Sequence, residues 1–247
     1  MDPQFIGMVF ESIIILCALI ILILILKKYL ERKHKLTLYL LVIFVNYTIA
    51  IIFSWLSKVL ILYSGIDYII NRTLPDPSTP ISWILYRIID FRVSFVFLSI
   101  AIYLSYILKV NVFEKGYNKI EKIVVIITFL VNIVCSLFLY EAGNTLLDAI
   151  AFLLIFIFMA MIYFPFLVRS YQSYRSTEES LFKKAFLSLS LMSLFFILVP
   201  FNFLIDRITI LLGGEGFTIF YFLAWIFVIL GIIGTYFGYI RPRSEEK

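Results

Sequence analysis

Seven long apolar segments, separated by short polar connections, are the dominant pattern of this 247-residue chain. They cover approximately residues 6–26, 37–57, 83–108, 123–140, 149–168, 185–205 and 217–240. A helix needs about 20 apolar residues to cross a hydrocarbon core of roughly 30 Å, and each segment is about that long. The pattern therefore predicts an all-α seven-transmembrane-helix bundle. Because no connection is long enough for a separate globular unit, we expect a single domain over residues 1–247.

Positive charge alternates in step with these segments. Lys and Arg are frequent in every second connection and after the last segment, at Lys27, Lys28, Arg32, Lys33, Lys35, Lys109, Lys115, Lys119, Lys122, Arg169, Arg175, Lys183, Lys184, Arg241, Arg243 and Lys247. The other connections hold only Lys58, Arg72 and Arg207. Basic connections stay on the cytoplasmic side of a membrane. The alternation predicts a multi-pass protein of the cell membrane with its N-terminus outside and its C-terminus inside.

Composition excludes a water-soluble domain, because 63% of the residues are hydrophobic and the mean hydropathy is +1.04. The net charge of +5 follows the predicted membrane orientation and includes no basic patch interleaved with aromatic residues. We therefore expect anionic inner-leaflet lipid as a partner, and no nucleic acid. The first segment has no basic leader and carries its charges after the apolar run, so we expect it to remain as a helix.

Residues that commonly bind metals or form cross-links are rare in this chain. Cys17 and Cys135 both lie inside apolar segments, where they are expected to pack as free thiols. His34 is the one histidine, which leaves no His-rich metal cluster, and we expect neither a metal nor a cofactor. The triplet beginning at Asn71 matches a glycan acceptor in the longest outer connection, about residues 58–82.

The polar side chains expected at membrane depth gather near the outer ends of the helices. They are Glu11, Arg87, Asp90, Arg92, Asp148, Asn202, Asp206 and Arg207. The cytoplasmic half has nothing comparable inside its apolar segments. Such side chains are costly in a bilayer and usually face a partner or a cavity.

Two main interpretations of this outer cluster are open. In the first, Arg92 pairs with Glu11 and Arg87 pairs with Asp90, three positions away, and the pairs hold the helices together. Asp148, Asp206 and Arg207 are then solvated helix ends. In the second, the cluster lines a pocket that opens to the outside and receives a polar or charged ligand. An ion pathway is a third interpretation.

Proline and glycine mark two further positions. Pro200 interrupts the backbone hydrogen bonding of the sixth segment and is a candidate hinge for a conformational change. Gly234 and Gly238 are four residues apart in the seventh segment, which favours close approach of a neighbouring helix.

Two known kinds of membrane protein require residues that this pattern does not supply. The last segment, 217–240, contains no lysine, which excludes a retinal protein of the known kind. Serine proteolysis within the membrane needs a histidine base, and His34 falls in a connection. We therefore expect a protein that is not an enzyme.

The closing stretch Gly234-Thr235-Tyr236-Phe237-Gly238-Tyr239-Ile240-Arg241-Pro242 and the span pattern resemble the seven-helix sensor region at the amino terminus of many prokaryotic histidine kinases. In that family the seventh helix commonly ends in an aromatic, glycine-containing stretch and a proline just inside the membrane. This chain departs from the family because it ends at Lys247 without a kinase module. The resemblance implies a sensor that signals through its cytoplasmic loops, especially Arg169 to Lys184, to a separate partner.

The leading hypothesis from the sequence is therefore a receptor-like sensor in signal transduction, with its ligand in the outer polar cluster. A small-solute transporter is the first alternative. A non-catalytic structural or assembly subunit is the second.

Overall fold

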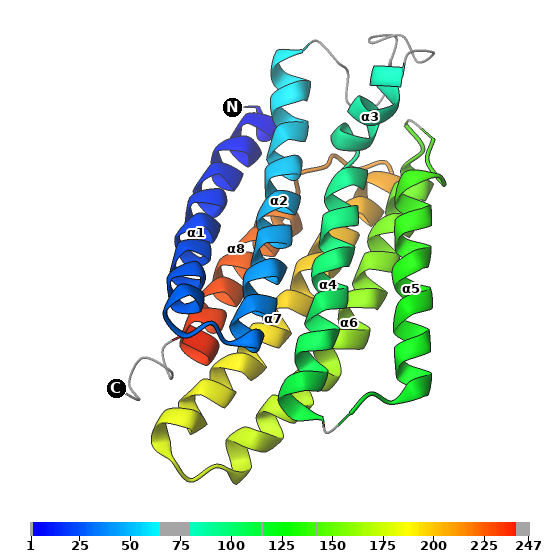
Figure 1. The fold of residues 1–247 in the computed structure, drawn as a ribbon. Helices are drawn as coiled ribbons and strands as arrows, with labels where there is room; N and C mark the ends of the chain where they lie inside the picture. Colours follow the sequence, from blue (N-terminus) through cyan, green and yellow to red (C-terminus); the bar gives the residue numbers. More distant parts are fainter. Residues whose placement is uncertain (1, 65–79, 115, 142, 241–247) are drawn as a thin grey trace.

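The computed structural model describes residues 2–64, 80–114, 116–141 and 143–240. Within these ranges the chain forms eight α-helices and a closing π-helical turn, η1, with no strand (Figure 1). Their bounds are α1 Pro3–Arg32, α2 Lys35–Tyr63, α3 Pro80–Ile89, α4 Arg92–Phe113, α5 Lys119–Leu137, α6 Thr145–Ser176, α7 Ser180–Leu211, α8 Ile219–Thr235 and η1 Tyr236–Ile240.

Seven of these elements are long and apolar enough to cross a membrane: α1, α2, α4, α5, α6, α7 and α8 continued through η1. The prediction of an all-α protein with seven apolar spans is confirmed. Most helices extend past the apolar segments because polar residues cap their ends. For example, Asp2 accepts a hydrogen bond from the backbone N–H of Gln4, and Asn144 accepts one from Leu147.

The prediction of one helix over residues 83–108 is wrong, because the chain turns between α3 and α4. Phe91 has a φ of 61°, a left-handed conformation that is unfavourable for a bulky side chain. Its ring is nevertheless buried and packs edge-on against the ring of Phe152 in α6. Burial of this ring offsets the backbone strain, and the turn allows α3 to lie at an angle to α4 (Figure 1).

The prediction that an outer connection begins at Lys58 is also wrong, because α2 continues to Tyr63. Lys58 is completely buried inside the bundle. The candidate glycan acceptor Asn71 lies outside the described residues, as do Arg241 and Pro242 of the stretch that resembles histidine-kinase sensors.

The spanning helices form a closed ring around an interior that side chains fill. In order around the ring, α1 packs on α2, α2 on α4, α4 on α6, α6 on α7, α7 on α8 and α8 on α1, while α5 lies outside α4 and α6. The end at which α1 begins is called the upper end here, as drawn in Figure 1. The starts of α4, α6 and α8 and the ends of α2, α5 and α7 also lie there. At the lower end, the α6–α7 hairpin projects beyond the other helices (Figure 1).

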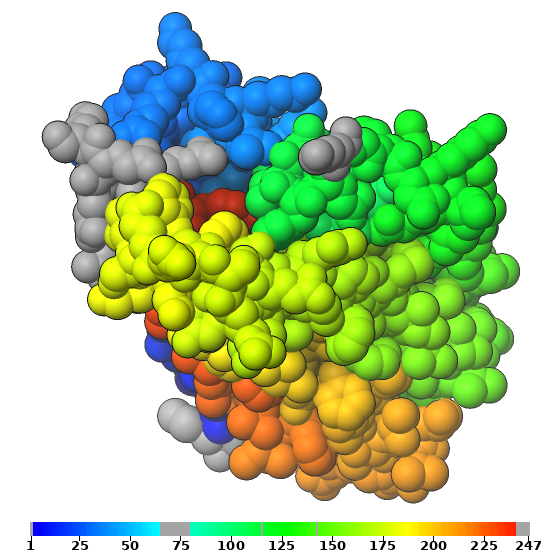
Figure 2. Space-filling view, turned by 90° about the horizontal axis from the view of Figure 1, so that it is seen from below, coloured from blue at the N-terminus to red at the C-terminus, as the bar shows by residue number. Residues whose placement is uncertain are grey.

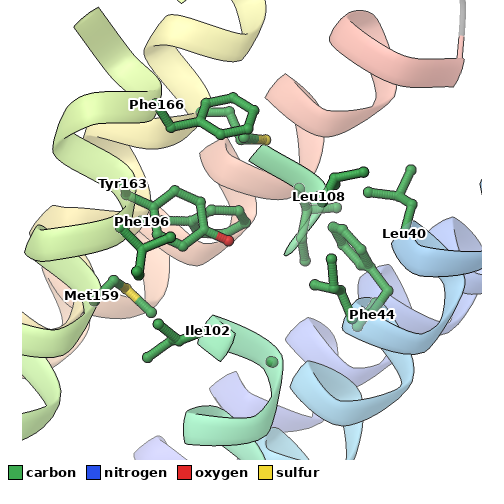
Figure 3. Close-up of a cluster of buried hydrophobic side chains, with 14 of the residues drawn as sticks. Leu40, Phe44, Ile102, Leu108, Met159, Tyr163, Phe166 and Phe196 are labelled. Atoms are coloured by element: carbon green, nitrogen blue, oxygen red, sulfur yellow. The ribbon is translucent and has the colours of Figure 1, made fainter. Parts of the chain in front are cut away.

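The centre of the ring is filled mainly by aromatic and branched side chains. Tyr163 and Phe166 of α6 lie beside Phe196 of α7, opposite Leu40 and Phe44 of α2 (Figure 3). The ring of Phe196 contacts the ring of Tyr163 edge-on, with 5.4 Å between their centroids. This layer closes the middle of the bundle.

Glycines bring the last span close to α7. A Cβ atom placed on Gly238 would lie 2.4 Å from the Leu189 side chain, and one placed on Gly231 would lie 2.5 Å from the ring of Phe196. The hydroxyl of Ser188 also donates to the carbonyl of Gly234 at 3.0 Å. Close approach at the predicted pair Gly234 and Gly238 is therefore present, and the neighbouring helix is α7.

Candidate functional site

The predicted polar cluster lies at the upper end of the bundle and is largely buried. Glu11, Arg87, Asp90, Arg92, Asn202, Asp206 and Arg207 are buried, and Asp148 is partly buried. They come from α1, α3, the α3–α4 turn, α4, α6 and α7. Buried charges are stable only when they are paired and hydrogen-bonded, so their partners decide what this cluster can do.

Arg92 pairs with Asp148 across α4 and α6. One guanidinium nitrogen of Arg92 lies 2.6 Å from Oδ1 of Asp148. Asp148 stands in the first turn of α6, where the helix dipole also favours a carboxylate. The predicted pair of Arg92 with Glu11 is wrong, because α4 presents Arg92 to α6 and not to α1.

Glu11 pairs instead with Lys58, and both side chains are completely buried. Glu11 Oε1 lies 2.8 Å from the Lys58 ammonium and also accepts hydrogen bonds from the hydroxyls of Ser54 at 3.0 Å and Tyr221 at 2.6 Å. One carboxylate oxygen therefore joins α1, α2 and α8. The sequence contained a signal for this role of Lys58, since the apolar residues of α2 continue beyond it to Tyr63.

Aromatic rings complete the surroundings of Lys58. Its ammonium lies 4.7 Å from the ring centroid of Phe91 and 5.4 Å from that of Tyr221. Rings at this distance attract a cation, and the attraction strengthens when water is excluded. The strained backbone of Phe91 thus brings a ring against a buried charge.

Tyr140 contacts both Arg87 of α3 and Asp90 of the following turn, the two residues that were predicted to pair within segment 83–108. Its hydroxyl donates to Oδ2 of Asp90 at 2.5 Å, and its ring lies 4.7 Å from the Arg87 guanidinium. Arg87 also donates to the backbone carbonyls of Leu137 and Trp83, each at 2.8 Å. Burial lowers the pKa of Arg87 from its ordinary value, but an arginine remains charged at neutral pH. These contacts fasten α3 to the end of α5.

The three predicted residues of α7 are buried, so the interpretation of Asp206 and Arg207 as solvated helix ends is wrong. They have different partners. Asp206 accepts hydrogen bonds from the backbone N–H and the hydroxyl of Thr218, at 2.8 and 2.7 Å, and so caps the start of α8. Asn202 donates to the carbonyl of Leu198 in its own helix. The Arg207 guanidinium lies 5.2 Å from the ring centroids of both Phe91 and Phe152.

A cavity of about 110 Å³ adjoins this charged layer. Its wall comes from α1, α2, α4, α6, α7 and α8 together with Phe91, and most lining side chains are apolar. Arg207 is the one member of the predicted cluster that lines it within the described residues, and it is also the one charged lining residue there. The structure therefore separates the paired charges from the space in which a molecule would fit.

Two polar groups on the cavity wall have no hydrogen-bond partner within the described residues. They are the hydroxyl of Ser94 and the indole N–H of Trp225. Some buried serines of this bundle donate to the carbonyl four residues earlier, as Ser105 does to Ala101 and Ser193 does to Leu189, whereas Ser99 and Ser170 also have no partner within the described residues. An unpartnered buried polar group in a native structure requires an explanation, and a ligand is one.

Two smaller cavities, each about 10 Å³, continue toward the lower end. The first shares Phe44 and Phe196 with the large cavity, and it shares Leu40 and Tyr239 with the second. Seen from below, the molecule has a recess between α2, α4 and α7, with the last residues of the chain's final helix visible inside it (Figure 2).

The lower end also contains a buried charge that was not predicted. Lys109 is 1% exposed, and its ammonium lies 2.5 Å from Glu121 and 3.3 Å from Glu114. We expected Lys109 in a cytoplasmic connection, one residue beyond the apolar segment 83–108, and did not expect it to be buried. The structure places Lys109 inside because α4 continues past the apolar segment and α5 packs against it.

The candidate hinge, Pro200, is buried and lines the large cavity. Helix α7 continues through it from Ser180 to Leu211. A hinge at this position stays a prediction. Within the described residues, no three His, Cys, Asp or Glu side chains are grouped so that they could hold a metal ion.

Comparison of the chain with protein-family models, with curated proteins and with solved structures finds no match.

Proposed function

We propose that this protein is a receptor-like membrane protein that takes up a small molecule in the large cavity and passes its occupancy to the lower end. The observation that carries the proposal is the cavity itself, about 110 Å³ within the ring of spanning helices. Enclosed pockets lined by apolar and aromatic side chains with few polar groups are typical of small-molecule sites.

The proposed ligand differs from the polar or charged one expected from the sequence. Glu11, Arg92, Asp148 and Asp206 already have charged or hydrogen-bonding partners, and none of them lines the cavity. A ligand in this space contacts mainly aromatic and aliphatic side chains. Its body is therefore apolar, and its polar part is confined to the few donors on the wall.

The orientation of the proposed receptor follows from its basic connections. The α1–α2 and α6–α7 connections and the α4–α5 connection all lie at the lower end, where Lys and Arg are concentrated. By the positive-inside rule the lower end is cytoplasmic and faces anionic lipid, and the upper end with its cavity lies toward the outside.

The α6–α7 hairpin is the proposed binding surface for a cytoplasmic signalling partner. Each of the two helices has 32 residues, a length of about 48 Å at 1.5 Å per residue, against a hydrocarbon core of roughly 30 Å. Both helices project beyond their neighbours at the lower end (Figure 1). Pro200 on the cavity wall belongs to α7, so one helix connects the cavity to the surface that a cytoplasmic signalling partner would bind.

Benzene is a suitable first probe for the cavity, and Ala50→Leu is the variant that fills it. Ala50 lines the cavity, whereas Ala160 of α6 does not and is half-buried, so Ala160→Leu is the matched control. In lipid nanodiscs, we expect benzene at about ten times its dissociation constant to raise the melting temperature of the wild type and of the control by about 3 °C. Ala50→Leu should not respond. Equal shifts in all three proteins would contradict cavity binding.

Transmission to the lower end needs a separate measurement. A bimane fluorophore on Arg175→Cys reports on the end of α6 once Cys17 and Cys135 are replaced by Ala. We expect benzene to change its emission in the wild-type cavity but not in the Ala50→Leu background. If benzene binds but the bimane emission does not change, the protein binds a ligand without transmitting its occupancy, and the proposed receptor function is wrong.

A transporter is the second candidate, and the two small cavities toward the lower end favour it. The layer containing Phe44 and Phe196 would then be a gate between the large cavity and the recess (Figures 2 and 3). Proteoliposomes distinguish the two functions, because a transporter moves a probe such as benzoate across the membrane and a receptor does not.

A further inference from the structure

The large cavity is long for its volume. Its lining residues on α7 lie between positions 196 and 207, and those on α8 lie between positions 221 and 232. A helix rises about 16 Å over either stretch. The lining residues on α2, between positions 44 and 54, cover about 15 Å. Three helices therefore agree that the cavity extends along the axis of the bundle.

Contacts between helices fix the two limits of the cavity. At the upper limit, the lining residues Ser54 and Tyr221 both donate to Glu11. At the lower limit, the ring of Tyr47 stacks on the ring of Phe196, with 5.5 Å between their centroids. Phe196 belongs to the layer that closes the middle of the bundle (Figure 3). The cavity therefore runs from the buried carboxylate down to this layer.

Length and volume together define the shape of the ligand. An apolar protein cavity of about 150 Å³ holds one benzene molecule, and the present cavity has about 110 Å³. A smaller volume over a greater length makes a narrow channel. A single ring would fill only part of this channel, and a fused ring system or a two-chain lipid is too wide for it. A straight hydrocarbon chain matches both its length and its width.

The unpartnered polar groups of the wall lie in the upper half of the channel. They are the hydroxyl of Ser94 and the indole N–H of Trp225, which have no hydrogen-bond partner within the described residues. Ser94 stands in the first turn of α4, and Trp225 lies one turn below Tyr221 in α8. Both helices begin at the upper end. A polar head group is therefore expected above, and an apolar tail below.

The lower half of the channel has hydroxyl groups that the fold already uses. Thr48 donates to the carbonyl of Phe44, and the hydroxyl of Tyr47 bonds to that of Tyr163. The other lining side chains at this level, such as Phe196 and Ile232, are apolar. This half therefore suits a hydrocarbon tail.

The head group of the ligand is expected to be neutral. A charge in an apolar interior requires a charged partner. Arg207, the charged lining residue among those described, is engaged within the fold and faces the rings of Phe91 and Phe152. A serine hydroxyl can donate as well as accept, so Ser94 suits the oxygen of an alcohol or of a carbonyl group.

We infer that the cavity binds a neutral, straight-chain amphiphile, an alcohol or a carbonyl compound, with its oxygen at Ser94 and its chain extending down to Phe196. The inference rests on the proposed function, since it assumes that the cavity is a ligand site. It adds the shape of the ligand, the charge of its head group and the direction in which it lies.

The first test measures that direction in a protein whose sole tryptophan is Trp225, made by Trp55→Phe and Trp83→Phe. Bromine quenches indole fluorescence on contact, and Trp225 is only 4% exposed, so bromine in the surrounding lipid does not reach it. In nanodiscs, we expect 2-bromodecan-1-ol, with its bromine beside the hydroxyl, to quench Trp225 strongly. We expect 10-bromodecan-1-ol, with its bromine at the far end of the chain, to quench it weakly.

The second test concerns the head group. Ser94→Ala should weaken the binding of 2-bromodecan-1-ol about fivefold, the effect of losing one hydrogen bond. Ser99→Ala is the matched control and should change nothing, because Ser99 is buried in the same helix and also unpartnered within the described residues, but does not line the cavity. Unlabelled decan-1-ol should displace the brominated alcohol, whereas decanoate should displace it poorly.

The third test concerns the tail. Ala18 lines the cavity and lies about 10 Å below Glu11 on α1, so Ala18→Leu fills the lower half of the channel. We expect this change to weaken 2-bromodecan-1-ol about tenfold, the effect of displacing about two methylene groups. The short 2-bromobutan-1-ol should bind almost unchanged. Ala160→Leu, outside the cavity, should affect neither alcohol.

Four results would each overturn the inference: equal quenching by the two bromodecanols, unchanged binding in Ser94→Ala, equal losses of the long and the short alcohol in Ala18→Leu, or displacement by decanoate as effective as by decan-1-ol. The cavity function still stands in these cases if benzene stabilises the wild type and not Ala50→Leu. If neither benzene nor any of the alcohols binds, the cavity function itself is wrong.

Discussion

Replacing Lys58 with Met removes the charge that neutralises Glu11 and keeps an unbranched side chain of similar length. The Glu11 carboxylate would remain completely buried, with the hydroxyls of Ser54 and Tyr221 as its donors. Removing one partner of a buried ion pair costs about 3–5 kcal/mol of stability. An ionised side chain at the centre of a membrane costs about 2.5–3.5 kcal/mol on insertion scales. We expect Lys58→Met to lower the free energy of unfolding by about 3 kcal/mol.

A double-mutant cycle isolates the pair. Glu11→Gln alone leaves the Lys58 ammonium with the Ser54 carbonyl and nearby aromatic rings, and we expect it to cost about 2 kcal/mol. The double variant leaves no unpaired charge, so its loss should be smaller than the sum of the single losses by about 2 kcal/mol.

The free energies come from equilibrium unfolding in mixed micelles by added dodecyl sulfate, followed by far-ultraviolet circular dichroism. Lys122→Met is the control, because Lys122 is exposed at the start of α5, and we expect it to change stability by about 0.5 kcal/mol or less. If the single losses at Glu11 and Lys58 add within about 0.5 kcal/mol, the two charges are not coupled and the pairing described here is wrong.

Three further substitutions have defined outcomes in the same unfolding assay. Gly238→Ala should destabilise by about 1–3 kcal/mol because its Cβ would lie 2.4 Å from a leucine side chain of α7, whereas Gly116→Ala, with open space around it, should be almost neutral. Asp148→Asn should cost about 3 kcal/mol because it leaves the Arg92 guanidinium buried without its anion, and a loss below about 1 kcal/mol would contradict the pair. Tyr47→Phe should lower the free energy of unfolding by only about 1 kcal/mol, because Tyr163 keeps its hydrogen bond to Ser105 of α4. A loss as large as that of Asp148→Asn would mean that Tyr47 contributes more than one hydrogen bond.

The number and place of the spanning helices could be predicted from the sequence because the bilayer imposes a length and an apolar composition on each one. The same physics located the polar cluster at one end, since a charge in a spanning helix is affordable only near its ends or beside a partner. The partners themselves could not be predicted. Arg92 pairs with α6 and Glu11 with α2, and this choice depends on how each helix is rotated and which neighbour it faces.

The break between α3 and α4 could not be predicted for a related reason. Residues 83–108 have no proline or glycine, and their local pattern is helical throughout. The left-handed conformation of Phe91 is stabilised by contacts that exist only in the folded bundle, with Phe152 of α6 and the ammonium of Lys58 in α2. Local sequence cannot show a turn that distant residues stabilise.

The most conspicuous residues of the sequence, its intramembrane charges, are largely used by the fold. In a low-dielectric interior a charge is tolerated only when it is compensated, so Glu11, Arg92 and Asp148 find partners before any ligand arrives. A ligand can bind only to groups that the folded chain has left unsatisfied. On the wall of the large cavity, the groups without a hydrogen-bond partner within the described residues are the hydroxyl of Ser94 and the indole N–H of Trp225. The unfilled hydrogen-bonding capacity of the cavity wall is therefore a better guide to the ligand than the density of charge around it.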